Sequence, residues 1–482
     1  MNKIFKVIWN RTTQSLVVAS ELAKGAAKAS ADGHGSNETL TNKVRQGKLK
    51  LSAISIALFT LGVVSPAHAI GGTSGSAVAF SDTQGLAIGY GVSTGNSQSI
   101  AIGGDKVRGN GANASAGGAV AIGAQSKAAG DTSVALGWNT QANNGNATAI
   151  GREAQATAAG TTAIGVKAQA SGQNSVAYGI ATAASGTKTV AVGSDAKANT
   201  DFTIAVGASA NSTGNSAIAT GANSVANGIG NIATGGGANA TGNGAVATGT
   251  SSVANGNNAV ALAANANATG AKAIAIGSDS KVSSDSGLAI GNAANASAIG
   301  AIAVGMNAAA TESYGVALGG KASGVYSFAA VNGSSTTDSY SIAIGYNAIS
   351  AGGNAQGLNA KAGSNSISLG RDSKADTSDA VAIGPNSNAS AINSLAFGNG
   401  ASASNGSAIA LGPRAKANSV AGIALGMDAN VSTQYSVALG AGSTAGARNS
   451  LTSIKVGGVE VGNNGKSSGT AVLAVGNSTA AR

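Results

Sequence analysis

Residues 134–179 read VALGWNTQANNGNATAIGREAQATAAGTTAIGVKAQASGQNSVAYG, and this stretch decides the fold. It contains four short apolar segments that each end in glycine: VALG, TAIG, TAIG and VAYG. Their glycines are Gly137, Gly151, Gly165 and Gly179, so the step between them is 14 residues each time. A fixed short period is typical of a solenoid, in which each repeat forms one coil.

The same period extends over residues 89–440 and gives 26 units. Three steps differ, with 20 residues over 103–123, 12 over 319–331 and 11 over 359–370. We call the residue that ends each apolar segment position zero; it is usually glycine, but in one unit the count places Asn359 there. A period sustained this far predicts an all-β solenoid of 14-residue repeats.

Glycine also recurs half a period later, seven residues after position zero, as at Gly172 and Gly186. Two glycines per unit predict two tight turns per coil, each at a positive φ that side chains disfavour. The turn glycines that we expect from the regular part of the repeat are Gly137, Gly151, Gly165, Gly179, Gly193, Gly207 and Gly221.

The two segments between the turns differ in pattern. Positions three and five are small, as in Ala168 and Ala170, whereas positions two and four are polar, as in Lys167 and Gln169. This alternation predicts a strand with one solvated face. The segment before position zero is apolar at consecutive residues, as in 176–178, which predicts burial of both its faces.

We therefore expect the side chains of these apolar segments to form the core of the roll and an interface between chains. The ten residues assigned to this role are Val134, Leu136, Val176, Tyr178, Ile204, Val206, Ile274, Ile276, Ile423 and Leu425. An apolar ridge along 26 coils, a rod of roughly 120 Å at ~4.8 Å per coil, is larger than a soluble monomer exposes. Identical chains packed around an axis would cover it.

Residues 47–69, GKLKLSAISIALFTLGVVSPAHA, have the features of a secretory signal peptide. Lysines precede the apolar run Leu51–Val64, and Ala67 and Ala69 form an A-x-A site, so cleavage is expected after Ala69. The run is shorter than the ~20 residues of a membrane span. No second stretch is as hydrophobic, so no transmembrane helix is predicted for the mature chain.

Ahead of the signal peptide, residues 1–25 form a basic, amphipathic extension, MNKIFKVIWNRTTQSLVVASELAKG. The segments MNKIF, VIWN and SELAKG resemble the extended signal peptide region of large autotransporters of Gram-negative bacteria. The resemblance implies Sec-dependent export of a large passenger.

The repeats themselves, such as Asp131–Gly137 and Asn174–Gly179, resemble the head repeats of YadA-like trimeric autotransporter adhesins over about residues 85–448. The resemblance implies a left-handed parallel β-roll that assembles as a homotrimer. It also implies a place at the cell surface or outer membrane, attachment to host cells or to matrix proteins of the collagen and fibronectin class, and autoaggregation.

These observations divide the chain into five segments. The last one shows no coiled-coil heptads and no set of alternating ~10-residue strands, so neither a stalk nor a membrane anchor is predicted in it. Without such an anchor, the chain is expected to be either secreted or a fragment of a longer protein. The segments are 1–25, the extended signal peptide region; 26–69, linker and signal peptide; 70–84, the start of the passenger; 85–448, the head repeats; and 449–482, a hairpin or closing cap made of Ile454–Val456, Gly462–Gly465 and Ala471–Val475.

Composition excludes several classes of protein. With 74 glycines but 3 prolines in 482 residues, the chain is not collagen-like, and with 43% hydrophobic residues it is not a disordered polar chain. Nine of the 28 basic residues but three of the 18 acidic ones lie in 1–69, so the net charge of +10 belongs mainly to the leader and does not indicate nucleic-acid binding. There is no cysteine, and His34 and His68 both precede the cleavage site. The sequence therefore predicts no enzyme, no metal and no cofactor.

Irregular units are the preferred candidates for ligand contacts, because loops and broken repeats carry function more often than regular ones. They are the insertion 104–119, with Asp105, Lys106 and Arg108, and the stretch 320–340, with Tyr326, Phe328 and Tyr340. The charged cluster Arg371–Asp379 is interpreted as a solvated turn rather than a cation site. The receptor-binding residues stay unknown.

Three functions fit the sequence. The first is an adhesin head, and the second is a structural spacer that supports self-association and biofilm without a specific receptor. The third, an ice-binding solenoid, is disfavoured because the outward positions mix Lys, Asp, Asn and Gln instead of a threonine lattice.

Overall fold

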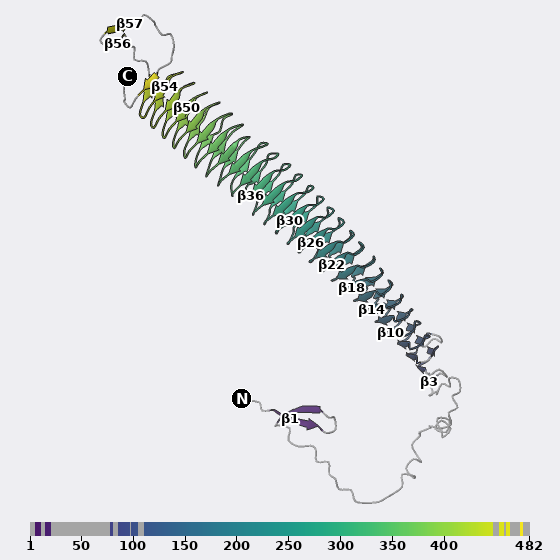
Figure 1. The fold of residues 1–482 in the computed structure, drawn as a ribbon. Coiled ribbons are helices and arrows are strands. Elements are labelled where there is room, and N and C mark those ends of the chain that lie inside the picture. Colours follow the sequence, from purple (N-terminus) through teal and green to yellow (C-terminus); the bar gives the residue numbers. More distant parts are fainter. Residues whose placement is uncertain are drawn as a thin grey trace, which may run out of the picture. The chain divides into compact units, whose positions relative to one another are not determined.

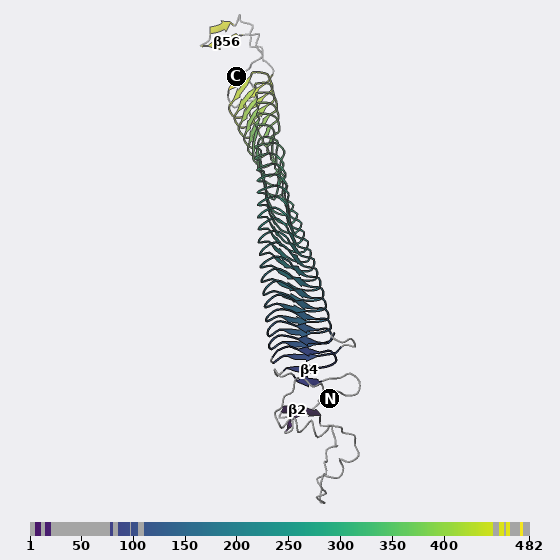
Figure 2. The ribbon, with the colours of Figure 1, turned by 90° about the vertical axis from the view of Figure 1, so that its right-hand side faces the viewer.

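The computed structural model describes residues 5–10, 15–20, 78–80, 85–96, 98–104, 110–446, 453–456, 459–462 and 473–475. The chain divides into two units, Met1–Val64 and Ser65–Arg482. The first unit contains the antiparallel strands β1 (Phe5–Asn10) and β2 (Ser15–Ser20), paired with Phe5 opposite Ser20. The second unit contains all the repeats, which stack into the long roll seen in two views in Figures 1 and 2.

Each coil of the roll contributes one three-residue strand to a first parallel sheet. These strands are the apolar segments before position zero: β4 (Leu86–Ile88), β6 (Ile100–Ile102), β8 (Val120–Ile122), β10 (Val134–Leu136), β12 (Thr148–Ile150), β14 (Thr162–Ile164), β16 (Val176–Tyr178), β18 (Val190–Val192), β20 (Ile204–Val206), β22 (Ile218–Thr220), β24 (Ile232–Thr234), β26 (Val246–Thr248), β28 (Val260–Leu262), β30 (Ile274–Ile276), β32 (Leu288–Ile290), β34 (Ile302–Val304), β36 (Val316–Leu318), β38 (Phe328–Ala330), β40 (Ile342–Ile344), β42 (Asn354–Gln356), β44 (Ile367–Leu369), β46 (Val381–Ile383), β48 (Leu395–Phe397), β50 (Ile409–Leu411), β52 (Ile423–Leu425) and β54 (Val437–Leu439).

Each coil also contributes one two-residue strand to a second parallel sheet, at positions four and five in all coils except those of β7 and β37, whose first turns differ in length. These strands are β5 (Ser93–Thr94), β7 (Asn113–Ala114), β9 (Lys127–Ala128), β11 (Gln141–Ala142), β13 (Gln155–Ala156), β15 (Gln169–Ala170), β17 (Ala183–Ala184), β19 (Lys197–Ala198), β21 (Asn211–Ser212), β23 (Val225–Ala226), β25 (Asn239–Ala240), β27 (Val253–Ala254), β29 (Asn267–Ala268), β31 (Lys281–Val282), β33 (Asn295–Ala296), β35 (Ala309–Ala310), β37 (Lys321–Ala322), β39 (Ser335–Thr336), β41 (Ile349–Ser350), β43 (Lys361–Ala362), β45 (Lys374–Ala375), β47 (Asn388–Ala389), β49 (Ser402–Ala403), β51 (Lys416–Ala417), β53 (Asn430–Val431) and β55 (Thr444–Ala445).

Further strands lie at the two ends of the roll. At the N-terminal end, β3 (Val78–Phe80) pairs antiparallel with β4. At the C-terminal end, β58 (Leu473–Val475) pairs parallel with β54 and adds one strand to the first sheet. A hairpin is formed by β56 (Ser453–Val456) and β57 (Val459–Gly462), with Val456 opposite Val459. Gly462 is the last residue of β57.

Neighbouring coils pair in register, so equivalent positions of successive repeats lie side by side. In β10, for example, Val134 lies opposite Thr148 and Val120. The Val134 amide donates to the Ala147 carbonyl of the next coil at 2.8 Å, and the Gly137 amide donates to the Ile122 carbonyl of the previous coil at 2.8 Å. These ladders confirm the all-β parallel solenoid that the period predicts.

The interior of the roll is filled mainly by alanine, together with serine and threonine. In the coil that begins at Gly165, Ala168, Ala170 and Ala177 are completely buried, and so is the Ser175 side chain. Positions three and five therefore point inward, as the alternation predicts. A coil with two strands this close together has no room for larger side chains, which explains the low aromatic content.

Buried hydroxyl groups satisfy the carbonyls of the turns, since an unpaired buried polar group is costly. At position ten, Thr189 donates to the Gly186 carbonyl at 2.9 Å. At position three, Ser224 donates to the Gly221 carbonyl at 2.8 Å and Ser252 to the Gly249 carbonyl at 2.9 Å. These three side chains thus act as turn caps, whereas the buried Ser133 and Ser280 hydroxyls have no hydrogen-bond partner among the described residues.

Rare larger core residues are accommodated by glycine across the interior. Val282 is fully buried at position five, where most coils have alanine. A Cβ built on Gly287, at position ten of the same coil, would lie 2.6 Å from Val282 Cγ1. The volume that valine adds is therefore removed at the facing position.

The assignment of the apolar segments to the core of the roll needs correction. In each of these strands the middle residue is buried, whereas the first and third side chains lie on the outer face, as for Val134, Ala135 and Leu136. Tyr178 is 54% exposed. The same outward orientation holds for the whole predicted set: Val134, Leu136, Val176, Tyr178, Ile204, Val206, Ile274, Ile276, Ile423 and Leu425. In a single chain these residues form an apolar ridge on the outer face, where all of them are half-buried except the exposed Tyr178. The cover of this ridge by other chains stays a prediction.

The turn glycines fall into two kinds. The seven expected ones, from Gly137 to Gly221, have φ between +126° and +140°. The glycines at position seven do not have a positive φ; instead, a Cβ on Gly172 would lie 1.8 Å from the carbonyl oxygen of Gly186. Position seven therefore requires glycine because adjacent coils approach closely, and the left-handed residues stand at positions two and nine, as in Lys167 (φ 58°) and Asn174 (φ 56°).

The irregular coils also differ from the count made on the sequence. Gly357 (φ 135°) occupies position zero instead of Asn359, because β42 pairs in register with both β40 and β44. The steps here are consequently 12 and 13 residues, and the coils lose residues in the second turn. The irregular part of the 20-residue step is likewise shorter than the predicted insertion 104–119. Within that stretch, Asn113 and Ala114 form the regular strand β7 of the second sheet.

Candidate ligand-binding surface

Lysine is concentrated at one position of the repeat. Residues 110–446 contain ten lysines, and seven of them are the first residue of a two-residue strand of the second sheet, six at position four and Lys321 two residues after Gly319 in a shortened coil. We call these seven the lysine row: Lys127, Lys197, Lys281, Lys321, Lys361, Lys374 and Lys416. All seven are exposed, and no acidic residue occupies position four of any coil in the described part of the roll.

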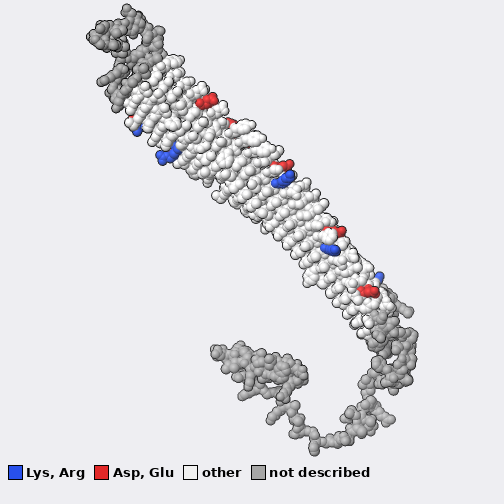
Figure 3. Space-filling model, viewed as in Figure 1, with Lys and Arg blue, Asp and Glu red and all other residues white. Residues whose placement is uncertain are grey.

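Acidic side chains lie instead at the turns, mostly at positions two and eight, as in Asp195 and Asp201. Four ion pairs join described residues: Arg152 with Glu153, Lys167 with Glu153, Arg371 with Asp372, and Arg414 with Asp428. None of them involves a lysine of the row. Charged groups are sparse and separated on the face drawn in Figure 3.

The Arg414–Asp428 pair is the best-formed ion pair. Arg414 Nε and Nη2 donate to Asp428 Oδ1 and Oδ2, each at 2.7 Å. The hydrogen bond from Arg414 lowers the pKa of Asp428 below its ordinary value. Both side chains are largely in solvent, so the pair orients the turn and contributes little to stability.

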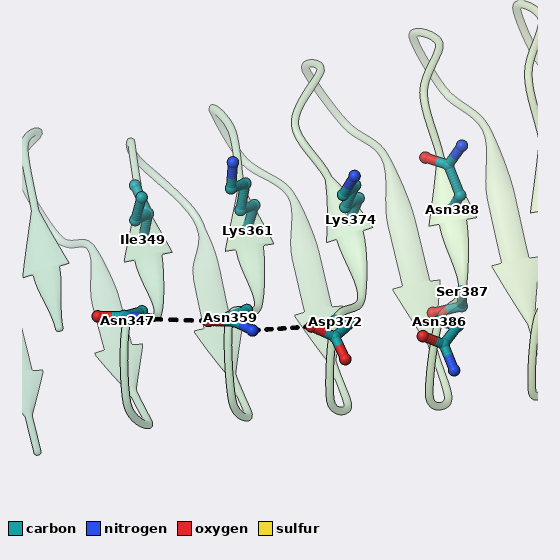
Figure 4. A pocket seen from close by; sticks show the side chains of 9 residues that line it. All are labelled: Asn347, Ile349, Asn359, Lys361, Asp372, Lys374, Asn386, Ser387 and Asn388. Atoms are coloured by element: carbon teal, nitrogen blue, oxygen red, sulfur yellow. Dashed lines mark hydrogen bonds between the residues drawn. The ribbon is translucent and has the colours of Figure 1, made fainter. Parts of the chain in front are cut away.

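A groove of about 540 Å³ crosses β41, β43, β45 and β47, in the region of the shortened coils. Two parallel rows of side chains border it, as Figure 4 shows. Position two supplies Asn347, Asn359, Asp372 and Asn386, and position four supplies Ile349, Lys361, Lys374 and Asn388, with Ser387 between the rows.

Two lysines of the groove lie next to each other. Lys361 and Lys374 are register partners in adjacent strands, so their backbones are ~4.8 Å apart. The acidic member of the groove, Asp372, accepts a hydrogen bond from Asn359 Nδ2 at 2.8 Å and pairs with Arg371 Nε at 3.5 Å. Like charges on directly paired residues are unfavourable unless a counterion screens them, so this groove is suited to an anion.

A second exposed feature is a column of three tyrosines at position nine. The Tyr314 and Tyr326 rings stack with centroids 5.0 Å apart, and the Tyr326 and Tyr340 rings with centroids 5.6 Å apart. Tyr340 is 74% exposed. Two of these three tyrosines lie in the stretch 320–340, whereas Phe328 belongs to β38 in the first sheet and is not part of the column.

Several predicted sites fall outside the described residues. These are Ala67 and Ala69 of the cleavage site and Asp105, Lys106 and Arg108 of the insertion. Within the described ranges, no group of three or more acidic or histidine side chains could hold a metal ion, which includes the cluster Arg371–Asp379. Nor does any described segment form a helix that is long and apolar enough to cross a membrane.

Comparison with protein families matches both parts of the chain. Residues 1–49 match the extended signal peptide of the type V secretion system. The YadA head domain repeat, a unit of two copies, matches 114–140, 128–154, 142–165, 156–180, 184–210, 240–262, 254–280, 268–294, 283–308, 322–348, 362–387, 378–401, 389–415, 403–429 and 417–443. Together the head matches cover more than half of the 482 residues. The chain belongs to the YadA-like trimeric autotransporter adhesins. No curated protein matches it.

Membership of this adhesin family accounts for both the N-terminal extension and the repeats of the sequence. The extended signal peptide directs export, and the head repeats form the coils described above. In the count made on the sequence, five lysines of the row stand at position four, whereas Lys321 and Lys361 stand at position two. Only the strand register of the structure brings these two into the row.

Proposed function

We propose that this chain forms the head of a homotrimeric adhesin that attaches bacteria to host cells or extracellular matrix and to each other. The proposal rests chiefly on the head-repeat matches along residues 114–443. Left-handed winding of the coils and residence at the cell surface are parts of the same proposal. The head itself performs no catalysis in this account.

The exposed apolar ridge supports the trimer. Its outer side chains include Tyr178 (54% exposed), Phe397 (46%) and Leu411 (43%), which stand at the same position of three coils. A ridge repeated over 26 three-residue strands far exceeds the few hundred Å² that soluble monomers expose in one patch. Packing three ridges around a common axis would bury them together.

The full chain is therefore expected to sediment with three times the mass of a single chain. The triple variant Val176→Asp, Val190→Asp and Ile204→Asp should lower the temperature at which the trimer dissociates in a gel run without boiling, because each aspartate places a charge in the interface. The control Gln141→Asp, Gln155→Asp and Gln169→Asp adds the same charge to the second sheet and should leave that temperature unchanged. A monomeric wild-type chain would rule out the trimer.

Departures from a uniform lattice favour an adhesive role over that of a spacer. A spacer needs equal coils, whereas this roll has shortened coils next to a groove and seven of the ten lysines of residues 110–446 in one row. Beads coated with the full chain should bind collagen, fibronectin or epithelial cells more than albumin-coated beads do. Beads that bind only each other would favour the spacer.

A further inference from the structure

We propose that the second sheet carries a binding strip for a linear sulfated polysaccharide, centred on the groove between Lys361 and Lys374. This inference names a ligand class for the proposed adhesin and in that sense rests on the proposed function. It stands on three observations: unneutralised lysines, their linear spacing, and the hydroxyl-binding character of the groove.

In the described part of the roll, the lysines of the row form no ion pairs, although Lys416 lies close enough to Asp428 to contribute to the lowered pKa of that carboxyl group. Each of these lysines is exposed on the second sheet. Cations of this kind bind polyanions by releasing condensed counterions, so affinity falls as salt rises. The acidic residue nearest the groove floor, Asp372, is already engaged by Arg371 and Asn359.

The spacing of the row fits a linear ligand. Lys281, Lys321 and Lys361 are each separated by three steps of the second sheet, which is ~14 Å at ~4.8 Å per step. Lys374 follows Lys361 by one step, and Lys416 follows Lys374 by three. The five ammonium groups thus lie along one line of ~48 Å parallel to the axis of the roll, and the groove crosses this line where two of them are adjacent.

The remaining lining of the groove favours a sugar chain over other polyanions. Asn347, Asn359, Asn386 and Asn388 present amide groups, which donate to and accept from sugar hydroxyls. In the described strands of the second sheet, the position that the row occupies carries no aromatic residue on which a nucleic-acid base could stack. Its lysines are spread along a line rather than gathered in the dense basic cluster that anionic membranes attract.

The test uses the full chain and immobilised heparin as the sulfated probe, with binding measured at several salt concentrations. The variant Lys361→Gln with Lys374→Gln should weaken heparin binding about tenfold and reduce the dependence on salt, because two contacts with the polyanion are lost. The matched control is Lys127→Gln with Lys197→Gln, two lysines of the same row that lie five steps apart and outside the groove. The control should weaken binding by less than twofold, and both variants should keep the melting temperature of the wild type.

Specificity is tested with desulfated heparin, double-stranded DNA and vesicles that contain phosphatidylserine, all of which should bind more weakly than heparin. Equal loss of heparin binding in the groove and control variants would overturn the proposal, since net charge alone would then explain binding. Tighter binding to DNA or to vesicles would overturn it as well. If coated beads attach to cells, and the groove variant attaches equally well in the presence and absence of heparin, the ligand class is wrong while the adhesin function stands. If instead the beads attach to no cell or matrix protein, while heparin binding still depends on the groove, the ligand class stands and the adhesin function is wrong.

Discussion

Ala247→Asp is expected to lower the free energy of unfolding by at least ~3 kcal/mol, since a buried, unpaired charge costs several kcal/mol. Ala247 is completely buried, and the inward residues of its coil, Ala238, Ala240 and Ala245, are all alanine. The inward side chains of this coil offer no polar partner for a carboxylate, and the Asn231 amide of the preceding coil is already bonded to the Ala240 carbonyl and the Ala245 amide. Urea denaturation followed by circular dichroism measures the loss.

The control for this variant is Ala222→Asp, which makes the same change at an exposed turn position and should alter stability by less than ~0.5 kcal/mol. Burial should also raise the pKa of the new carboxyl group in the folded state. Its destabilising effect is therefore full at neutral pH and decreases as the pH falls below that raised pKa. Equal stability of the two variants at pH 7 would contradict the alanine-filled interior.

Gly256→Ala should be the second highly damaging substitution, with an expected loss of about 3 kcal/mol from overpacking. A Cβ at this position would lie 1.8 Å from the carbonyl oxygen of Gly270 and 2.3 Å from its carbon. Both are backbone atoms of the next coil, so the clash can be relieved only by moving two coils apart. Thermal unfolding of the variant measures the effect.

Gly145→Ala provides the comparison, because its Cβ would meet nothing closer than the Asp131 carbonyl oxygen at 3.8 Å. Alanine there restricts the unfolded chain and should be neutral or stabilising by ~0.4–1 kcal/mol. If both substitutions lowered stability equally, glycine at position seven would serve backbone flexibility rather than close packing of coils.

The period of the sequence predicted the solenoid, the two turns per coil and the inward positions three and five, because each of these depends on local pattern alone. The role of Gly172 and its equivalents could not be predicted, since the distance between coils is not written in any one repeat. The assignment of Val134 and Leu136 to the core of the roll was wrong for a related reason, while their place in an interface between chains stays a prediction. Apolar residues at consecutive positions do not tell which one faces inward, and only the narrow interior selects the middle alanine.

The groove was also beyond prediction from the sequence. Counting in steps of 14 placed Asn359 at position zero, whereas the sheets keep their register and put Gly357 there. Residues are lost at the turns and not in the strands, because a lost strand residue would break the hydrogen-bond ladders. Lys361 and Lys374 become neighbours only through this correction.

In-register stacking has a consequence for how such proteins diverge. Duplication or loss of a gene segment that encodes one 14-residue unit would change the reach of the head by ~4.8 Å and leave every later side chain on its original face. Any other change in length must be absorbed in a turn, as in the coils that contain Gly353 and Gly363. Variation among related strains is therefore expected as whole-unit differences in length, with the distances between charged groups changing in discrete increments.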